Sequence, residues 1–247
     1  MARRPKREGA RMGNKEIIGR DIDYFKQYPE PIMELMQKEH FTIVNSTISY
    51  YGPMLYYIAR AMGAEQVLEI GHAEGYTGFY LAHAIKDNGQ RFGMKNNMYY
   101  GIDIVQTEKV RECFKEANLP ATIINMDSMT LPGRFKDMKF DIIFQDGCHD
   151  TEHVLYELEA MYPLLKPNGL WIAHDTAGPA EEAWHKIMEM IIPKDVCVED
   201  FYTERNRDGK LHKAKYKFEY IRLLGIYGIS IMRKLEGVDL QKRYWTD

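Results

Sequence analysis

The stretch Gln66-Val67-Leu68-Glu69-Ile70-Gly71-His72-Ala73-Glu74-Gly75-Tyr76-Thr77-Gly78 decides the fold of this chain. It begins as an apolar strand that ends in an acidic residue and a glycine, and a second glycine follows four positions later. Glycine has no Cβ, so this turn lets the backbone pass close to a ligand. The helical stretch 79–84 then offers free N–H groups to a carboxylate or phosphate. The spacing differs from Gly-x-Gly-x-x-Gly, which makes a nicotinamide dehydrogenase the weakest option.

Composition is that of a soluble globular protein. The 247 residues are 45% hydrophobic and 28% charged, which suits one large α/β domain with an N-terminal extension, or two small domains. A formal net charge of -3 argues against a general nucleic-acid coat. The three cysteines lack paired or metal-type spacing, and no apolar run is long enough to span a membrane. We therefore expect a reduced, cytoplasmic protein with no membrane partner.

Short apolar strands alternate with helices along the middle of the chain. The expected strands are 66–70, 98–105, 121–125, 140–144 and 170–173, and the expected helices are 53–62, 108–117, 151–162 and 180–190. This alternation predicts an α/β fold, with a Rossmann-like, doubly wound parallel sheet covered on both faces. A further helical stretch, 21–37, precedes it.

Acidic residues stand at or just past the end of every one of these strands. They are Glu69, Asp103, Asp127, Asp146 and Asp175. Ligands of open α/β sheets bind outside the carboxyl ends of the strands, near the point where strand order reverses. One acidic strand end means little, but five in succession outline the rim of one pocket.

The segment Glu69-x-Gly71-x-x-x-Gly75 resembles the first motif of the class I S-adenosylmethionine-dependent methyltransferases. The resemblance implies S-adenosylmethionine as cofactor, with the loop and the following Tyr76 and Thr77 around its methionine part. Thr77 could instead cap the helix. The resemblance also implies a seven-stranded sheet, mostly parallel with an antiparallel last strand, plus N-terminal helices. The last strand is expected at 228–233; the sixth is either 196–203 or 214–223.

The same resemblance implies roles for the acidic strand ends along the cofactor. Asp103 would accept the ribose hydroxyls, or alternatively cap the helix that follows. Asp127-Ser128 resembles the position that meets the adenine amino group, although an ordinary Asp-Ser turn explains it equally well. The resemblance also implies Glu69 as a cofactor-site residue that organises the loop.

The residues 140–149, 164–169 and 174–175 look like those of small-molecule O-methyltransferases with an Asp-Gly-x-His segment. These include macrolide-sugar and cephamycin-pathway enzymes and neighbour the catechol-O-methyltransferase-like group. The resemblance implies a divalent cation, Mg or Mn, bound by Asp146, His174 and Asp175 beside the transferred methyl. Histidine is a softer ligand than the acidic residue it replaces, and His174 and Asp175 could simply line the pocket. His149 would act with Asp146 in catalysis as the general base, or else cap a helix.

The leading hypothesis is methyl transfer to a small-molecule acceptor, most readily a hydroxyl oxygen. Cys148 is interpreted as a buried, inert thiol. We expect a basic tail over 1–15, a helical extension or lid over 16–64, and the methyltransferase domain over 65–247, in a chain that could form a homodimer or higher homo-oligomer. The basic, aromatic stretch 205–220 keeps an RNA- or nitrogen-directed enzyme open. A non-catalytic cofactor-binding protein is the third alternative.

Overall fold

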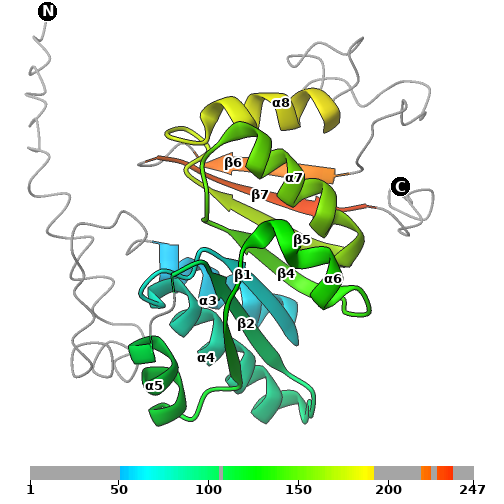
Figure 1. The fold of residues 1–247 in the computed structure, drawn as a ribbon. Helices are drawn as coiled ribbons and strands as arrows, with labels where there is room; N and C mark the ends of the chain where they lie inside the picture. Colours follow the sequence, from blue (N-terminus) through cyan, green and yellow to red (C-terminus); the bar gives the residue numbers. More distant parts are fainter. Residues whose placement is uncertain (1–50, 106–107, 192–217, 224–226, 236–247) are drawn as a thin grey trace, which may run out of the picture. The chain divides into compact units, whose positions relative to one another are not determined.

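The computed structural model describes residues 51–105, 108–191, 218–223 and 227–235 (Figure 1). All of these residues belong to one compact unit, Ile43–Asp247. The expected basic tail, the helical stretch 21–37 and the candidate strand 196–203 lie outside the described residues. The expected domain boundaries therefore stay predictions.

A seven-stranded sheet forms the centre of the fold. Its strands are β1 (Gln66–Ile70), β2 (Met98–Asp103), β3 (Ala121–Asn125), β4 (Phe140–Gln145), β5 (Leu165–His174), β6 (Phe218–Leu223) and β7 (Ile229–Lys234), in the order β3-β2-β1-β4-β5-β7-β6. The first five strands pair in parallel, whereas β7 pairs antiparallel with both β5 and β6. The predicted mostly parallel sheet with an antiparallel last strand is confirmed, and the sixth strand lies in the second of the two candidate stretches.

Helices connect the strands and cover the sheet (Figure 1). They are α3 (Tyr51–Met62), α4 (Tyr76–Phe92), α5 (Glu108–Glu116), α6 (Leu131–Phe135), α7 (Thr151–Met161) and α8 (Glu181–Ile191), with single 3₁₀ turns η2 (Ser128–Thr130) and η3 (Tyr162–Leu164). Neighbouring side chains of a strand point to opposite faces. Accordingly, Tyr99 of β2 stacks on Phe114 of α5, whereas Tyr100 contacts Phe135 of α6. The two helical layers therefore bury the two faces of the same strand.

The order of the strands reverses between β1 and β4, which both lie in the middle of the sheet. β1 pairs with β2 on one side and with β4 on the other. The chain thus builds outward in one direction through β2 and β3, and in the other direction from β4 onward. This arrangement leaves a crevice at the carboxyl ends of β1 and β4, which is where open α/β sheets bind ligands.

The helix α3 is joined to α4 by a buried amide. Asn88 of α4 is fully buried and donates to the carbonyls of Ala59 and Ala64, at 3.0 and 2.9 Å, while its Oδ1 accepts from Arg60 at 2.7 Å. Buried carbonyls left unpaired are costly, so one amide that satisfies two of them holds the end of α3 in place. Of the expected N-terminal helices, α3 is confirmed.

Helix α6 and turn η2 were not expected from the sequence. Proline is favoured in the first turn of a helix, as in α6, because its missing N–H has no helical partner there. Among the described helices, none has the length and apolarity that a membrane crossing requires.

Candidate active site

The loop between β1 and α4 adopts backbone conformations that favour glycine. Gly71 and Gly75 have φ values of 81° and 84°. A Cβ on Gly71 would lie 2.3 Å from the carbonyl oxygen of Asp146, and one on Gly75 would lie 2.8 Å from Cγ1 of Val110. Both positions therefore exclude other residues by conformation and by contact. The first glycine brings the end of β1 directly against the end of β4.

A cavity of about 400 Å³ opens beside this loop, at the carboxyl ends of β1, β2, β3 and β4. Its lining consists of Ile70, Gly71, Ala73, Ile102, Asp103, Ile104, Val105, Met126, Asp127, Ser128, Asp146, Gly147, Cys148 and His153. The structure thus brings together the predicted Gly71, Asp103, Asp127, Ser128 and Asp146. Three separate strand ends supply carboxylates to one pocket.

Asp103 organises the loop as well as lining the cavity. One of its oxygens accepts from the backbone N–H of Ala73 at 2.8 Å, and the other accepts from that of Val105 at 2.9 Å. A carboxylate oxygen has more than one lone pair, so each still has capacity for a ligand hydroxyl. Asp103 does not cap α5 by these contacts; they tie the glycine loop to the exit of β2.

Asp127 and Ser128 form the turn that the sequence allowed and also line the cavity. Asp127 caps η2, where its Oδ1 accepts from the backbone N–H of Met129 at 2.9 Å. Ser128 is buried, and its Oγ lies 2.7 Å from Nε2 of His153. The turn and the adenine contact are therefore compatible, because the cap uses Oδ1 of Asp127 and does not involve the other carboxylate oxygen.

Four of the predicted cofactor residues, Glu69, Gly75, Tyr76 and Thr77, are not among the residues that line the cavity. Glu69 is buried under the loop and accepts a hydrogen bond from the hydroxyl of Tyr99. Burial raises the pKa of Glu69 to about 8, although the bond from Tyr99 lowers it. Thr77 is buried in the first turn of α4, whose N-cap is Gly75 with no side-chain cap bond, so the capping alternative for Thr77 is wrong.

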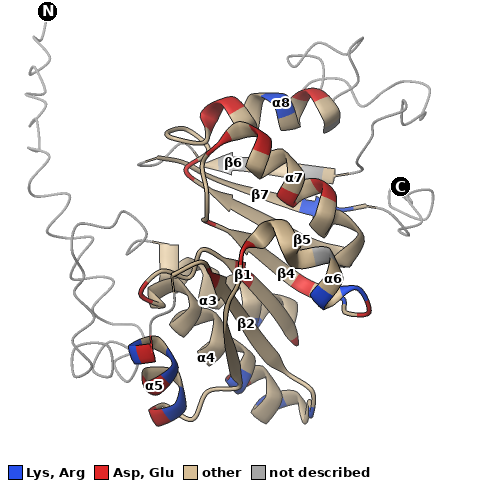
Figure 2. Ribbon diagram, viewed as in Figure 1, with Lys and Arg blue, Asp and Glu red and all other residues tan. Residues whose placement is uncertain are grey.

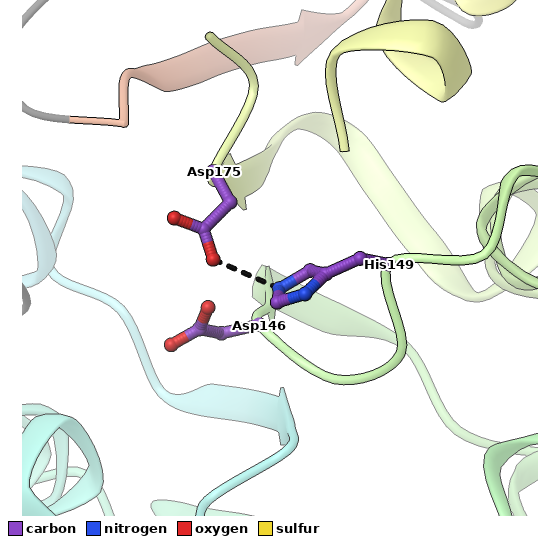
Figure 3. A group of neighbouring side chains, drawn as sticks. All are labelled: Asp146, His149 and Asp175. Carbon is purple, nitrogen blue, oxygen red and sulfur yellow. Dashed lines mark ion pairs between the residues drawn. The ribbon is translucent and has the colours of Figure 1, made fainter. Parts of the chain in front are cut away.

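An acid–histidine cluster lies at the ends of β4 and β5, next to the cavity. Figure 3 shows Asp146, His149 and Asp175 pointing toward one another from three backbone segments. His149 Nε2 is 2.8 Å from Asp175 Oδ2. Behind them, the buried His174 places Nδ1 2.9 Å from Asp146 Oδ1 and 3.3 Å from Asp175 Oδ1. Asp146 belongs to both the cluster and the cavity.

The charges of the cluster shift one another's pKa values. Burial would lower the pKa of His174, but the hydrogen bonds and charges of Asp146 and Asp175 outweigh it and raise the pKa to about 9. Hydrogen bonding to Asp175 raises the pKa of His149 above its usual 6.5, against the effect of burial. Burial would raise the pKa of Asp175, but the two histidines hold it well below its usual value. Burial raises the pKa of Asp146.

The N-cap of α7 is Asp150, not His149. The Asp150 carboxylate accepts from the backbone N–H groups of Glu152 and His153 at 3.1 and 3.2 Å. The alternative in which His149 serves as a helix cap is therefore wrong. Its imidazole is left to Asp175 and is about one-third exposed, with a relative side-chain accessibility of 38%. An oriented, accessible imidazole of this kind can exchange protons with a ligand.

Three residues of the cluster could hold a cation. Asp146, His149 and Asp175 offer ligand atoms that all lie within 4.8 Å of one another. Two carboxylates and an imidazole fit a divalent ion of the manganese, iron or zinc type better than magnesium. The geometry brings His149 into this set, whereas the predicted ligand His174 contacts the two carboxylates from behind. A histidine that orients ligating carboxylates supports a metal site from its outer side.

Two residues of the cavity were not expected there. Cys148 is exposed and lines the cavity, so its interpretation as a buried thiol is wrong. The turn after β4 carries it outward, and its Sγ accepts from the backbone N–H of Asp150 at 3.4 Å. His153 was not identified from the sequence. Its position three residues after the helix cap, Asp150, was the available signal, because the first turn of a helix after a strand faces the ligand side of the sheet.

The fold, the glycine loop and the convergent strand-end carboxylates agree with the predicted resemblance to the class I S-adenosylmethionine-dependent methyltransferases. Comparison with known proteins supports this class. Residues 68–176 match the family model described as a methyltransferase domain. The chain is 26% identical over 245 residues to a caffeoyl-CoA O-methyltransferase of Eucalyptus gunnii, an alignment that covers 91% of this chain and 92% of that protein.

Solved structures show the same fold. A methyltransferase of Podospora anserina, bound to S-adenosylhomocysteine, matches with a TM-score of 0.59 at 16% identity over 92% of this chain and 99% of its own. The O-methyltransferase TomG of Streptomyces achromogenes, in complex with S-adenosylmethionine, also matches with a TM-score of 0.59, at 15% identity over 90% of this chain and 99% of its own. The predicted fold and enzyme class are confirmed.

Proposed function

We propose that this enzyme transfers the methyl group of S-adenosylmethionine to a hydroxyl oxygen of a small-molecule acceptor. One observation carries the proposal: Asp146 lines the cavity and also belongs to the acid–histidine cluster. A cofactor in the cavity would therefore carry its methyl group toward the residues that can handle an acceptor hydroxyl. The curated relatives named as caffeoyl-CoA O-methyltransferases support oxygen as the acceptor atom.

The chain's own residues supply the proton chemistry. The acceptor oxygen attacks the methyl carbon, the carbon–sulfur bond breaks, and S-adenosylhomocysteine leaves. The hydroxyl proton passes to His149, which Asp175 orients from 2.8 Å and whose protonated form that carboxylate stabilises. The raised pKa of His149 strengthens it as a base near neutral pH. Holding both reactants in line lowers the entropic part of the barrier.

The residues present fit a divalent cation, which Asp146, Asp175 and His149 would hold. When bound, such an ion would lower the pKa of the acceptor hydroxyl. A neutral imidazole has one nitrogen lone pair, so His149 serves either as a ligand or as the base. The choice between these roles decides whether activity depends on metal.

Activity with a panel of hydroxyl acceptors tests the proposal. S-Adenosylhomocysteine release is measured with a catechol, caffeoyl-CoA and a sugar diol, in the presence of manganese, magnesium or a chelator. We expect turnover of at least one acceptor, and an at least roughly hundredfold loss in Asp146→Asn, as for the loss of a group aligned with the reacting atoms. Asp137→Asn, which changes an exposed carboxylate, should keep the wild-type rate.

The outcomes separate the alternatives. Rates that rise with manganese in the wild type but not in Asp146→Asn support the cation site; equal rates with chelator leave His149 as the base. Binding of S-adenosylmethionine without turnover of any acceptor would favour a non-catalytic protein, and salt-dependent RNA retention would favour a nucleic-acid substrate. The described elements intersperse acidic and basic side chains, as on α5 (Figure 2), and the basic stretch 205–217 lies outside them. A homo-oligomer and a cytoplasmic location stay predictions.

A further inference from the structure

A fully buried carboxyl group lies behind one wall of the cavity. Glu157, in the second turn of α7, has no exposed surface. A Cβ on the cavity residue Gly147 would lie 3.8 Å from Glu157 Oε1, so the carboxyl group lies close behind that turn. Moving an isolated carboxylate out of water costs on the order of several kcal/mol. Buried carboxylates therefore persist only where polar groups pair with them.

The polar neighbours of Glu157 lead directly to the cavity. His153 Nε2 lies 3.2 Å from Glu157 Oε1 and 2.7 Å from Ser128 Oγ. Burial raises the pKa of Glu157, while Ser128, His153 and Gln145 act in the opposite direction. Ser128 and His153 both line the cavity. The carboxyl group, the imidazole and the hydroxyl therefore form one connected cluster with its polar end at the ligand.

This cluster restricts what the Ser128 hydroxyl can offer to a ligand. A serine hydroxyl has one proton to donate and two lone pairs. If Nε2 of His153 carries no proton, the hydroxyl donates to it; if Nε2 is protonated, the hydroxyl accepts from it and donates to the Glu157 carboxylate. In each tautomer an acceptor inside the cluster, His153 Nε2 or the Glu157 carboxylate, is available for the proton of Ser128. The hydroxyl then presents a lone pair, and not a proton, to the cavity.

The neighbouring Asp127 makes the same end of the cavity still richer in acceptors. A carboxylate group can only accept hydrogen bonds. An acceptor-only wall complements an amino group, such as that at position 6 of adenine, and repels a carbonyl oxygen at the same position. A polar site that is left unpaired by a near-isostere discriminates strongly against it.

We propose that Glu157 and His153 are positioning residues that hold Ser128 as a hydrogen-bond acceptor, so that the cavity selects a 6-amino purine over a 6-keto purine. This inference rests on the proposed function, because the purine is that of S-adenosylmethionine. Neither residue contacts the reacting atoms in this scheme; both act through Ser128.

The test compares two ligands that differ only at that position of the base. Affinities for S-adenosylhomocysteine and S-inosylhomocysteine are measured by calorimetry in the wild type, Glu157→Gln and Ser128→Ala. We expect the wild type to prefer the adenine ligand at least about tenfold, the effect of about one hydrogen bond left unmade. In Glu157→Gln the amide can donate to Ser128 and free its proton, so the preference should fall to within about threefold.

Glu159→Gln is the matched control, because it makes the same chemical change two residues along α7 at an exposed position. It should keep the wild-type preference. An unchanged preference in folded Glu157→Gln, or in Ser128→Ala if the first variant does not fold, overturns the inference and leaves the proposed function intact. A wild type that binds neither ligand overturns both. A merely structural role of Glu157 would weaken both ligands equally and keep their ratio.

Discussion

At the scale of single residues, Asp103 has two tasks, holding the glycine loop and lining the cavity, and experiments can separate them. Its oxygens hold the backbone of Ala73 and Val105, and it lines the cavity. Asp103→Asn keeps one acceptor oxygen but removes the charge and the second acceptor. We expect the dissociation constant of S-adenosylhomocysteine to rise about tenfold or more, as for a lost hydrogen bond to a charged group. Calorimetry measures this change.

A ligand without ribose hydroxyls separates the two tasks of Asp103. If the carboxylate binds those hydroxyls, a dideoxyribose analogue should show a smaller difference in affinity between the wild type and Asp103→Asn than S-adenosylhomocysteine shows. The losses from the two changes would then not add, as expected for groups that interact. Fully additive losses would show that Asp103 acts only on the loop and would contradict the ribose contact.

His149 should titrate above the usual pKa of a histidine because Asp175 holds its protonated form. The base must be neutral to accept a proton, so the rate should fall as the pH drops through this raised pKa. In Asp175→Asn the partner charge is lost, and the midpoint should move to lower pH. Histidine titration by NMR gives the pKa without an acceptor. A midpoint that stays in place would show that Asp175 does not set the pKa of His149.

The sequence predicted where these residues meet but not how they pair. Because parallel strands end at one edge of the sheet, strand-end acids such as Asp103 and Asp146 could be assigned to one pocket in advance. The pairing of His149 with Asp175, and the position of His153 beside Ser128, depend on side-chain packing between elements far apart in the chain. Pattern does not contain that information, which is why Cys148 was misplaced.

At the scale of elements, the glycine loop is constrained at a particular residue. Gly71 and Gly93 both have positive φ, 81° and 67°. A Cβ on Gly71 would collide with the backbone of Asp146, whereas a Cβ on Gly93 would meet nothing within 4 Å. We expect Gly93→Ala to cost about 1 kcal/mol, the conformational penalty alone. Gly71→Ala should cost several times more and abolish cofactor binding.

Chemical denaturation and calorimetry with S-adenosylhomocysteine compare the two variants. Because the change is the same at both positions, any difference reports the contact between β1 and β4. Equal effects on unfolding and unaltered cofactor affinity in Gly71→Ala would contradict the close approach that the loop geometry requires.

Element positions followed closely from the sequence where the pattern was periodic. The strands 66–70 and 121–125 were predicted with the bounds that the structure has. The sequence could not decide between the two candidates for the sixth strand. Period-two alternation predicts that a segment is a strand, but it does not predict which strand it pairs with. The turn η2 and the helix α6 were not predicted, because elements of three to five residues are too short to show a helical period.

At the scale of the whole molecule, two buried titratable groups make the free energy of unfolding depend on pH. The pKa of His174 is raised to about 9 and that of Glu69 to about 8, so in both cases the folded state binds protons more tightly than the unfolded chain. Stability from His174 is present in full below its unfolded pKa of about 6.5 and is lost as the pH rises through 9. Glu69 causes a loss in the same direction, which is complete near pH 8.

We therefore expect the free energy of unfolding to decrease as the pH rises from 6.5, and the part of the decrease above pH 8 to belong chiefly to His174. The total from His174 is on the order of 3 kcal/mol by the pKa difference. His174→Gln keeps a hydrogen-bonding side chain but does not titrate, so its decrease above pH 8 should be largely absent. Because this variant also leaves two carboxylates without a cation, the comparison is of slopes, not of absolute stability.

Urea denaturation at pH 6.5, 8 and 9.5 measures these slopes in the wild type, His174→Gln and His185→Gln. His185 is exposed on α8, and its Nε2 lies 4.0 Å from Oε1 of Glu181, which is too far for a hydrogen bond. The His185→Gln variant should therefore follow the wild type. A wild-type slope above pH 8 that persists in His174→Gln would show that the Asp146–His174–Asp175 contacts do not bind the extra proton. The same contacts orient the carboxylates proposed for catalysis, so the pH at which the fold weakens should also be the pH at which the active site loses its arrangement.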